Sequence, residues 1–362
     1  MLPVAIYART DVGKEHHTNE DSFAVRHLSP SDALLLVCDG MGGMGRGDEA
    51  SSLGVDVITA HAAKAEEDGP IDRMATAIQL ADRAIRAALC SGIRGRPGCT
   101  VASLFIRGNQ GFVSWVGDSR VYLVRDGAVV QRTRDHKIIE DLIEAGELTR
   151  AEAKTSGLSS MLSRALGGRP PGGEPLEVAS LPTPWDLQPG DWLVLCSDGL
   201  ADLVPDEELP SYFEDSDPAA ASQALIQIAL DRGGHDNITV ICANWLPEGA
   251  AIPATEQLRS NPTELAEDLL ARADAAVNGP NPDASTEPFA PERKDWPEPD
   301  SDARIDHPTR PRAAVIQRRP KSTPKATMLL AVMLAFALAI FTFSAVHYTR
   351  LVTTHATAAS NR

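Results

Sequence analysis

Short apolar runs bounded by Gly, Asp or Asn recur through the first 247 residues. Six runs rich in Val, Leu and Ile predict β-strands, at Ala33–Cys38, Val101–Ile106, Gly111–Val116, Arg120–Val124, Trp192–Cys196 and Ile238–Cys242. Helical spacing of apolar residues predicts helices at Gly47–Ala63 and Ile71–Cys90, and a third helix is expected within His136–Ala145. Because strands come in groups of two or three with helices between the groups, the pattern favours an α+β layered fold with antiparallel sheets.

The chain has a different pattern near its last residues. Met328–Val346 is a run of nineteen residues without a charge, which as a helix would span roughly 28 Å, close to the thickness of the bilayer hydrocarbon. We therefore expect a single transmembrane helix at 328–348, with a buried core helix as the weaker alternative. Four basic residues lie between positions 318 and 325 and only two follow the run, so the positive-inside rule places residues 1–325 in the cytoplasm. The tail 349–362 would then be extracytoplasmic.

Composition changes sharply between these two regions. Residues 248–327 are rich in Pro and poor in large apolar residues, which predicts a mostly disordered linker, with one short amphipathic helix possible at Thr263–Val277. This linker is acidic over 248–306 and basic over 307–325, and the basic part would suit anionic lipid head groups. The whole chain has a net charge of −16, which argues against a nucleic-acid partner.

The five cysteines form no CxxC pair, so the sequence predicts neither a zinc knuckle nor a disulfide framework. Cys38, Cys196 and Cys242 lie in or beside apolar runs and are expected in the core.

Carboxylates stand at the ends of several predicted strands. Asp39-Gly40 and Asp198-Gly199 each follow an apolar run, Asp118 follows another, Asp236 precedes the last strand, and Glu20-Asp21 precedes Ser22–Val25. Such side chains are held rigidly and can converge, and a set of carboxylate and carbonyl oxygens suits Mg²⁺ or Mn²⁺. A single Asp-Gly after a strand is more often only a turn. The glycines from Gly40 to Gly45 also match GxGxxG, but the acidic second strand of a dinucleotide-binding fold does not follow.

Eight motifs in order resemble the bacterial form of the PP2C (PPM) family of metal-dependent serine/threonine phosphatases. The eight motifs are Asn19-Glu20-Asp21, Val37–Gly43, Gly98-Cys99-Thr100, Trp115–Arg120, Thr133–His136, Ser163–Gly167, Leu195–Leu200 and Gly234–Val240. The resemblance covers about residues 5–245 and implies a catalytic domain at 1–247. It also implies a four-layer α/β/β/α sandwich of two antiparallel sheets flanked by helices.

The resemblance further implies a centre of two or three Mn²⁺ or Mg²⁺ ions. Asp39 would bridge two metals, the Gly40 carbonyl would bind one, and Asp198 and Asp236 would hold the other. Asp118, with Asp198, would form a third metal site, while Glu20 and Asp21 would orient metal-bound waters or bind directly. A metal-bridging water would attack phosphorus, and the segment from about His136 to Gly168 would be a flap beside the cleft.

One position departs from the family pattern. The family usually has Arg three residues before the Asn of its first motif, where it grips the substrate phosphate, and here that position is His16. His16 could contact phosphate or be a solvated loop residue, and Lys14 could substitute as a flexible charge. Phosphate binding is therefore expected to be weaker or more dependent on pH.

Three hypotheses follow, of which the third is a metal-dependent phosphohydrolase for small phosphoesters. The leading one is a membrane-tethered phosphatase, monomeric in its catalytic domain, acting on phosphoserine and phosphothreonine in proteins that a bacterial Ser/Thr kinase modifies. The alternative is a catalytically weak phosphoprotein-binding regulatory module on the same fold, which only the His16 substitution supports.

Overall fold

The computed structural model describes residues 2–42, 46–64, 68–89, 96–153, 156–158, 160–168, 175–214 and 216–250. The expectations for the linker with its short helix, the membrane span 328–348 and the tail 349–362 lie outside these ranges, apart from residues 248–250. None of the helices within the ranges is long and apolar enough to cross a bilayer.

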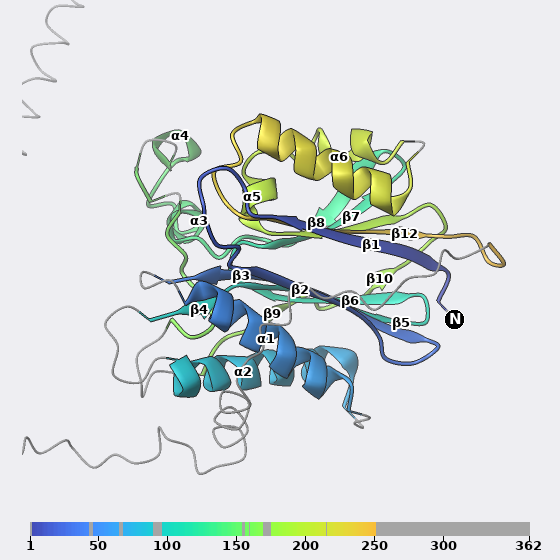
Figure 1. Ribbon diagram of the computed structural model, residues 1–362, viewed down its shortest axis with the longest axis horizontal. Helices are drawn as coiled ribbons and strands as arrows, with labels where there is room; N and C mark the ends of the chain where they lie inside the picture. Colours follow the sequence, from blue (N-terminus) through green and yellow to red (C-terminus); the bar gives the residue numbers. More distant parts are fainter. Residues whose placement is uncertain are drawn as a thin grey trace, which may run out of the picture. The chain divides into compact units, whose positions relative to one another are not determined.

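Two antiparallel sheets lie face to face (Figure 1). The first has the order β1-β12-β11-β7-β8, formed by Val4–Asp11, Ile238–Trp245, Trp192–Cys196, Arg120–Arg125 and Ala128–Arg132. The second has the order β10-β6-β5-β3-β2, formed by Trp185–Asp186, Gln110–Val116, Val101–Arg107, Asp32–Met41 and Asp21–His27. Two short strands join the second sheet, β4 (Gly98–Cys99) beside β3 and β9 (Ala179–Ser180) beside β6.

Helices cover the outer face of each sheet (Figure 1). The second sheet is covered by α1 (Gly47–Ala62) and α2 (Pro70–Leu89), and the first by α6 (Pro218–Asp231). Shorter elements are α3 (Ile138–Glu144), α4 (Arg150–Ala153), α5 (Asp198–Ala201) and the 3₁₀ turn η1 (Leu209–Tyr212). The α/β/β/α sandwich expected from the resemblance is confirmed.

Alternation along each central strand builds three apolar layers. In β3, Leu34 and Leu36 pack toward α1 and α2, whereas Leu35 and Val37 pack into the layer between the sheets. Because successive side chains of a strand point to opposite faces, a strand covered on both faces must be apolar throughout, as the run ALLLVC is. Cys38 and Cys99 lie in the layer under the helices, while Cys196 and Cys242 lie under α6. All four are buried free thiols, and the core position expected for Cys38, Cys196 and Cys242 is confirmed.

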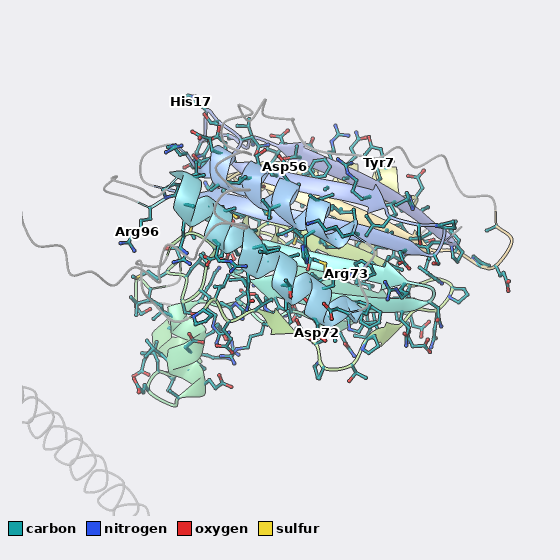
Figure 2. All side chains as sticks on the ribbon, turned by 90° about the horizontal axis from the view of Figure 1, so that it is seen from below. Tyr7, His17, Asp56, Asp72, Arg73 and Arg96 are labelled. Atoms are coloured by element: carbon teal, nitrogen blue, oxygen red, sulfur yellow. The ribbon has the colours of Figure 1, made fainter. Side chains whose placement is uncertain are left out.

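The two helices on the second sheet are amphipathic. Figure 2 looks onto them and shows Asp56 and Asp72 on their outward side. Arg73, next to Asp72, is instead buried, and its guanidinium carbon lies 5.8 Å from the centre of the Phe105 ring. This cation–π contact joins α2 to the middle of β5.

Candidate active site

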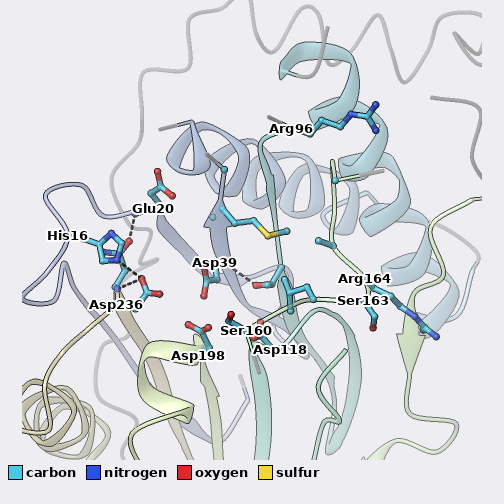
Figure 3. A pocket seen from close by; sticks show the side chains of 18 residues that line it. His16, Glu20, Asp39, Arg96, Asp118, Ser160, Ser163, Arg164, Asp198 and Asp236 are labelled. Atoms are coloured by element: carbon cyan, nitrogen blue, oxygen red, sulfur yellow. Dashed lines mark hydrogen bonds and ion pairs between the residues drawn. The ribbon is translucent and has the colours of Figure 1, made fainter. Parts of the chain in front are cut away.

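The strand-end carboxylates line one cleft of about 620 Å³ (Figure 3). Asp39 lies near the end of β3, Asp198 lies two residues after β11 at the start of α5, and Asp118 lies in the loop between β6 and β7. Glu20 directly precedes β2, and Asp236 lies two residues before β12. Acids from both sheets therefore meet at one place, as the sequence predicts.

Asp39 is fixed through its backbone. Its N–H donates to the Thr100 hydroxyl at 3.0 Å, and its carbonyl accepts from the Thr100 N–H at 2.8 Å. The Thr100 hydroxyl also lies 2.7 Å from the Ser119 hydroxyl. The strand that carries Asp39 is thus joined to the loop that carries Asp118.

A second set of contacts fixes Gly40 and Glu20. The Gly40 N–H donates to the Glu20 carbonyl at 3.1 Å, and the Glu20 N–H donates to the Asn237 side-chain oxygen at 2.7 Å. The Asn237 amide also donates to the carbonyls of Val12 and Thr18 at 2.8 and 3.1 Å. This buried amide therefore holds three segments of the site in register.

Asp21 lies beneath the cleft and does not line it. Its carboxylate accepts from the Ser197 hydroxyl at 2.8 Å, and the same hydroxyl oxygen accepts from the Thr239 N–H at 2.9 Å. Burial raises the pKa of Asp21 to about 6. Asp21 thus connects the strand that follows Glu20 to the residue that precedes Asp198.

The loop from Gly117 to Arg120 is held from both sides. The Gly117 N–H donates to His136 Nδ1 at 3.1 Å, and the His136 N–H donates to the Gly117 carbonyl at 2.9 Å. Arg120 makes a bidentate pair with Asp135, both distances being 2.8 Å. The buried Asp118 between them forms an ion pair with Lys137, whose ammonium nitrogen lies 3.0 Å from Oδ2.

Burial and mutual repulsion raise the pKa values of these acids. Burial, together with the charges of Asp198 and Asp21, raises the pKa of Asp39 well above its usual range. Burial raises the pKa of Asp198 to about 8, and the charge of Asp118 acts in the same direction. Burial also raises the pKa of Glu20. A group of carboxylates that cannot all ionise without added positive charge is the electrostatic setting of a cation site.

A divalent cation fits this setting by charge and by ligand type. Asp198 Oδ1 is buried without a hydrogen-bond partner, which is costly unless a cation takes that role. Within the described ranges, no three Asp, Glu, His or Cys side chains converge closely enough to enclose a cation by themselves. Mg²⁺ commonly binds through one or two carboxylates and keeps several waters, for which the open cleft leaves room.

Basic side chains lie at the rim of the same cleft (Figure 3). His16 Nε2 lies 3.5 Å from Asp236 Oδ1, and both side chains are about half exposed. Arg96 and Arg164 also line the cleft, and Arg164 pairs with Glu177 at 3.1 Å. Lys14 does not line it; the Lys14 N–H instead donates to the Gly234 carbonyl at 2.7 Å.

The predicted flap segment forms one wall of the cleft. Ser160 and the run from Leu162 to Ala165 line it, and α3 and α4 lie within this segment. The segment is joined to the loop of Asp118 because the Ser163 N–H donates to the His136 carbonyl at 2.8 Å.

Four residues of this site were not singled out from the sequence. Asn237 and Ser197 lie inside quoted motifs, next to the expected ligands, and that proximity was the available signal. Lys137 directly follows the Thr133–His136 motif, and Arg164 lies within Ser163–Gly167. The ion-pair partners of Lys137 and Arg164 lie 19 or fewer residues away in the sequence. The hydrogen-bond partners of Asn237 and Ser197, Glu20 and Asp21, lie far away in the sequence, so these two roles depended on the fold.

Comparison with known proteins agrees with this geometry. The sequence profile of the protein phosphatase 2C family matches residues 13–229, and the chain belongs to this family. It is 34% identical over 242 residues to the serine/threonine protein phosphatase PstP of Mycobacterium tuberculosis, covering 66% of this chain but only 44% of PstP. It is 31% identical over 242 residues to the serine/threonine phosphatase stp of Listeria monocytogenes, covering 64% of this chain and 92% of that protein.

A solved structure extends the comparison to the metal centre. The chain is similar to the catalytic domain of PstP in complex with two manganese ions, with a TM-score of 0.55 and 29% identity, over 67% of this chain and 99% of that one. The family assignment and this relative together support a metal-dependent serine/threonine phosphatase.

Proposed function

We propose that this chain hydrolyses phosphoserine and phosphothreonine in proteins, with two Mn²⁺ or Mg²⁺ ions in the cleft. The observation that carries the proposal is the group of five cleft acids, in which Asp198 Oδ1 is buried without a partner and the pKa of Asp39 is raised. The substrates are proteins that a bacterial Ser/Thr kinase has modified.

Each acid has a distinct part in this proposal. Asp39, the Gly40 carbonyl, Asp198 and Asp236, which all line the cleft, would hold the ions. Glu20 lines the cleft and would orient coordinated water, whereas Asp21, beneath the cleft, holds Ser197 next to Asp198. When bound, the ions lower the pKa of coordinated water and neutralise the charge that develops on phosphoryl oxygens.

The substrate phosphate would meet the basic rim of the cleft. His16 Nε2 lies 3.5 Å from Asp236 Oδ1, so its ring already contacts one of the cleft acids. Arg96 and Arg164 remain charged at every physiological pH and line the same cleft. We therefore assign the main phosphate charge to the arginines and a weaker contact to His16.

The direct test measures phosphate release from a phosphothreonine peptide with Mn²⁺. Asp198→Asn should lower kcat/KM by at least about 100-fold, because the ion loses a charged ligand. Asp231→Asn is the matched control, since Asp231 is exposed at the end of α6 and does not line the cleft. Equal activity of the two variants would contradict the assignment.

The same assay separates the enzyme from a phosphoprotein-binding module. A binding module would retain the phosphopeptide and release no phosphate, with or without Mn²⁺. Multiple turnovers by the unsubstituted chain, lost in Asp198→Asn, would exclude it.

We also propose that the chain is anchored in the cell membrane by residues 328–348, with the catalytic domain in the cytoplasm. The uncharged run Met328–Val346 and the basic residues before it support this orientation. Anchoring would raise the local concentration of the enzyme near membrane-bound kinases and their targets.

Cell fractionation tests the anchor. The full chain should sediment with membranes and resist extraction at high salt, whereas a chain ending at residue 325 should be recovered in the soluble fraction. A full chain released by salt alone would contradict a membrane span.

A further inference from the structure

Lys137 places a buried positive charge beside Asp118, one of the acids that line the cleft. Its ammonium nitrogen lies 3.0 Å from Asp118 Oδ2 and 3.4 Å from Asp202 Oδ1. The side chains of Lys137 and Asp118 are only 9% and 5% exposed, while that of Asp202 is 56% exposed. The ion pair with Asp118 is therefore screened from solvent, unlike a surface salt bridge.

The backbone around Lys137 holds this ammonium in place. Lys137 forms an isolated antiparallel bridge with Leu162, and the N–H of the next residue, Ile138, donates to the Met161 carbonyl at 2.8 Å. On the other side, the His136 N–H donates to the Gly117 carbonyl, directly before Asp118. Lys137 thus lies where the flap segment joins the loop of the metal-site acids.

The charge of Lys137 acts on more than one acid of the cleft. Burial raises the pKa of Asp118, and the nearby Lys137 opposes that rise by charge and by hydrogen bond. Lys137 also opposes the rise in the pKa of Asp198. A covalently attached cation therefore supplies, beside these two acids, the positive charge that a bound metal would otherwise have to supply.

We propose that Lys137 occupies the place at which Asp118, together with Asp198, would hold a third divalent cation, so that this chain works with two. The inference rests on the proposed function, because it concerns the metals of the same cleft. Asp118 has its Oδ2 committed to the ammonium, and a divalent ion at that carboxylate would stand against the ammonium charge. The third metal site expected for Asp118 does not fit the residues that surround it.

Metal counting tests the inference without relying on activity. Isothermal titration calorimetry of the full chain in detergent, with Mn²⁺ as the titrant, should give two ions per chain. Lys137→Ser removes the ammonium and should add a third ion, bound at least about tenfold more tightly than any further binding to the unsubstituted chain. The double variant Lys137→Ser with Asp118→Asn should return the count to two.

Two control variants separate this role from a purely structural ion pair. Lys137→Arg keeps the cation and should keep the count at two. Asp202→Asn removes the more exposed partner and leaves the pair with Asp118, so its count should also stay at two. Circular dichroism spectra that match the unsubstituted chain would show that each variant is folded.

The outcomes distinguish failure of the inference from failure of the proposed function. Three ions on the unsubstituted chain, or two ions on a folded Lys137→Ser variant, would overturn the inference and leave the phosphatase assignment standing. The absence of any Mn²⁺ binding by the unsubstituted chain would instead overturn the proposed function.

Discussion

His136 shows how one side chain can make the stability of the site region depend on pH. Its ring is buried, stacks on Trp115 with 5.8 Å between ring centres, and accepts the Gly117 N–H through Nδ1. An imidazole that accepts through Nδ1 must be unprotonated there. Burial accordingly lowers the pKa of His136 to about 4.

This lowered pKa predicts a loss of stability in mild acid. Between about pH 6.5 and 4 the unfolded chain binds a proton at His136 that the folded chain does not, so the free energy of unfolding falls as the pH falls. His136→Gln removes this group, so the variant should lose less stability in acid than the unsubstituted chain. As the pH falls from 7 to 4, the difference in free energy of unfolding should shift in favour of the variant by up to about 3 kcal/mol. Urea unfolding of both chains across this range measures the difference, and a difference independent of pH would contradict the assignment.

The residues of the site differ in how far the sequence reveals them. Asp39, Asp118, Asp198 and Asp236 could be predicted because each stands beside an apolar run, where a charged residue is unexpected unless a turn or a ligand requires it. Asn237 could not, since its hydrogen bonds reach residues more than 200 positions away. The ion pair of Lys137 with Asp118 likewise depends on a loop geometry that no spacing rule specifies.

Three elements meet at Gly40 with no room for a side chain. A Cβ on Gly40 would lie 2.2 Å from the Gly47 carbonyl oxygen at the start of α1 and 2.4 Å from the Glu20 carbonyl oxygen before β2. Both neighbours are backbone atoms of hydrogen-bonded segments, so neither can move away cheaply. The end of β3 can approach α1 and β2 this closely only with glycine.

Gly40→Ala should therefore separate these elements and disturb the neighbouring Asp39. We expect the free energy of unfolding to fall by at least about 2 kcal/mol, because the added methyl overpacks a rigid contact. Gly69→Ala is the matched control, since a Cβ at Gly69 meets nothing within 4 Å, and it should leave stability nearly unchanged. Thermal unfolding of the two variants checks this, and equal melting temperatures would contradict the close contact.

Elements with clear apolar patterns were predicted well, and those with mixed patterns were missed. The six predicted strands and the helices α1, α2 and α3 are present, with bounds shifted by one to three residues at most ends. β1 was missed because only one face of this edge strand is fully buried, which gives it a broken pattern. α6 was missed although Asp217 is a helix N-cap, its carboxylate accepting from the Ala220 N–H at 2.8 Å, and Pro218 follows it.

At the scale of the whole described domain, the cleft joins the two sheets. Asp39 belongs to β3 of the second sheet, whereas Asp198 follows β11 and Asp236 precedes β12 of the first. Outside the cleft the sheets are held mainly by the apolar layer between them. Ions bound to these acids would cross-link the sheets at one end.

Metal binding should therefore stabilise the folded domain. At a Mn²⁺ concentration 100 times the dissociation constant, a site absent from the unfolded chain adds about 2.7 kcal/mol, or roughly 5–10 °C in melting temperature. Differential scanning calorimetry with Mn²⁺ and with EDTA measures the shift. Asp198→Asn should show a smaller shift, and an unchanged melting temperature in EDTA would contradict binding between the sheets.

The ion pair of Lys137 with Asp118 also bears on how the proposed activity responds to the supply of divalent metal. A cation that is part of the chain is present at every concentration of free metal, whereas bound ions must be captured from the surroundings. Activity that requires two captured ions rises less steeply with metal concentration than activity that requires three. We expect the proposed phosphatase activity to fall gradually, and without a sharp threshold, when the divalent metal becomes scarce.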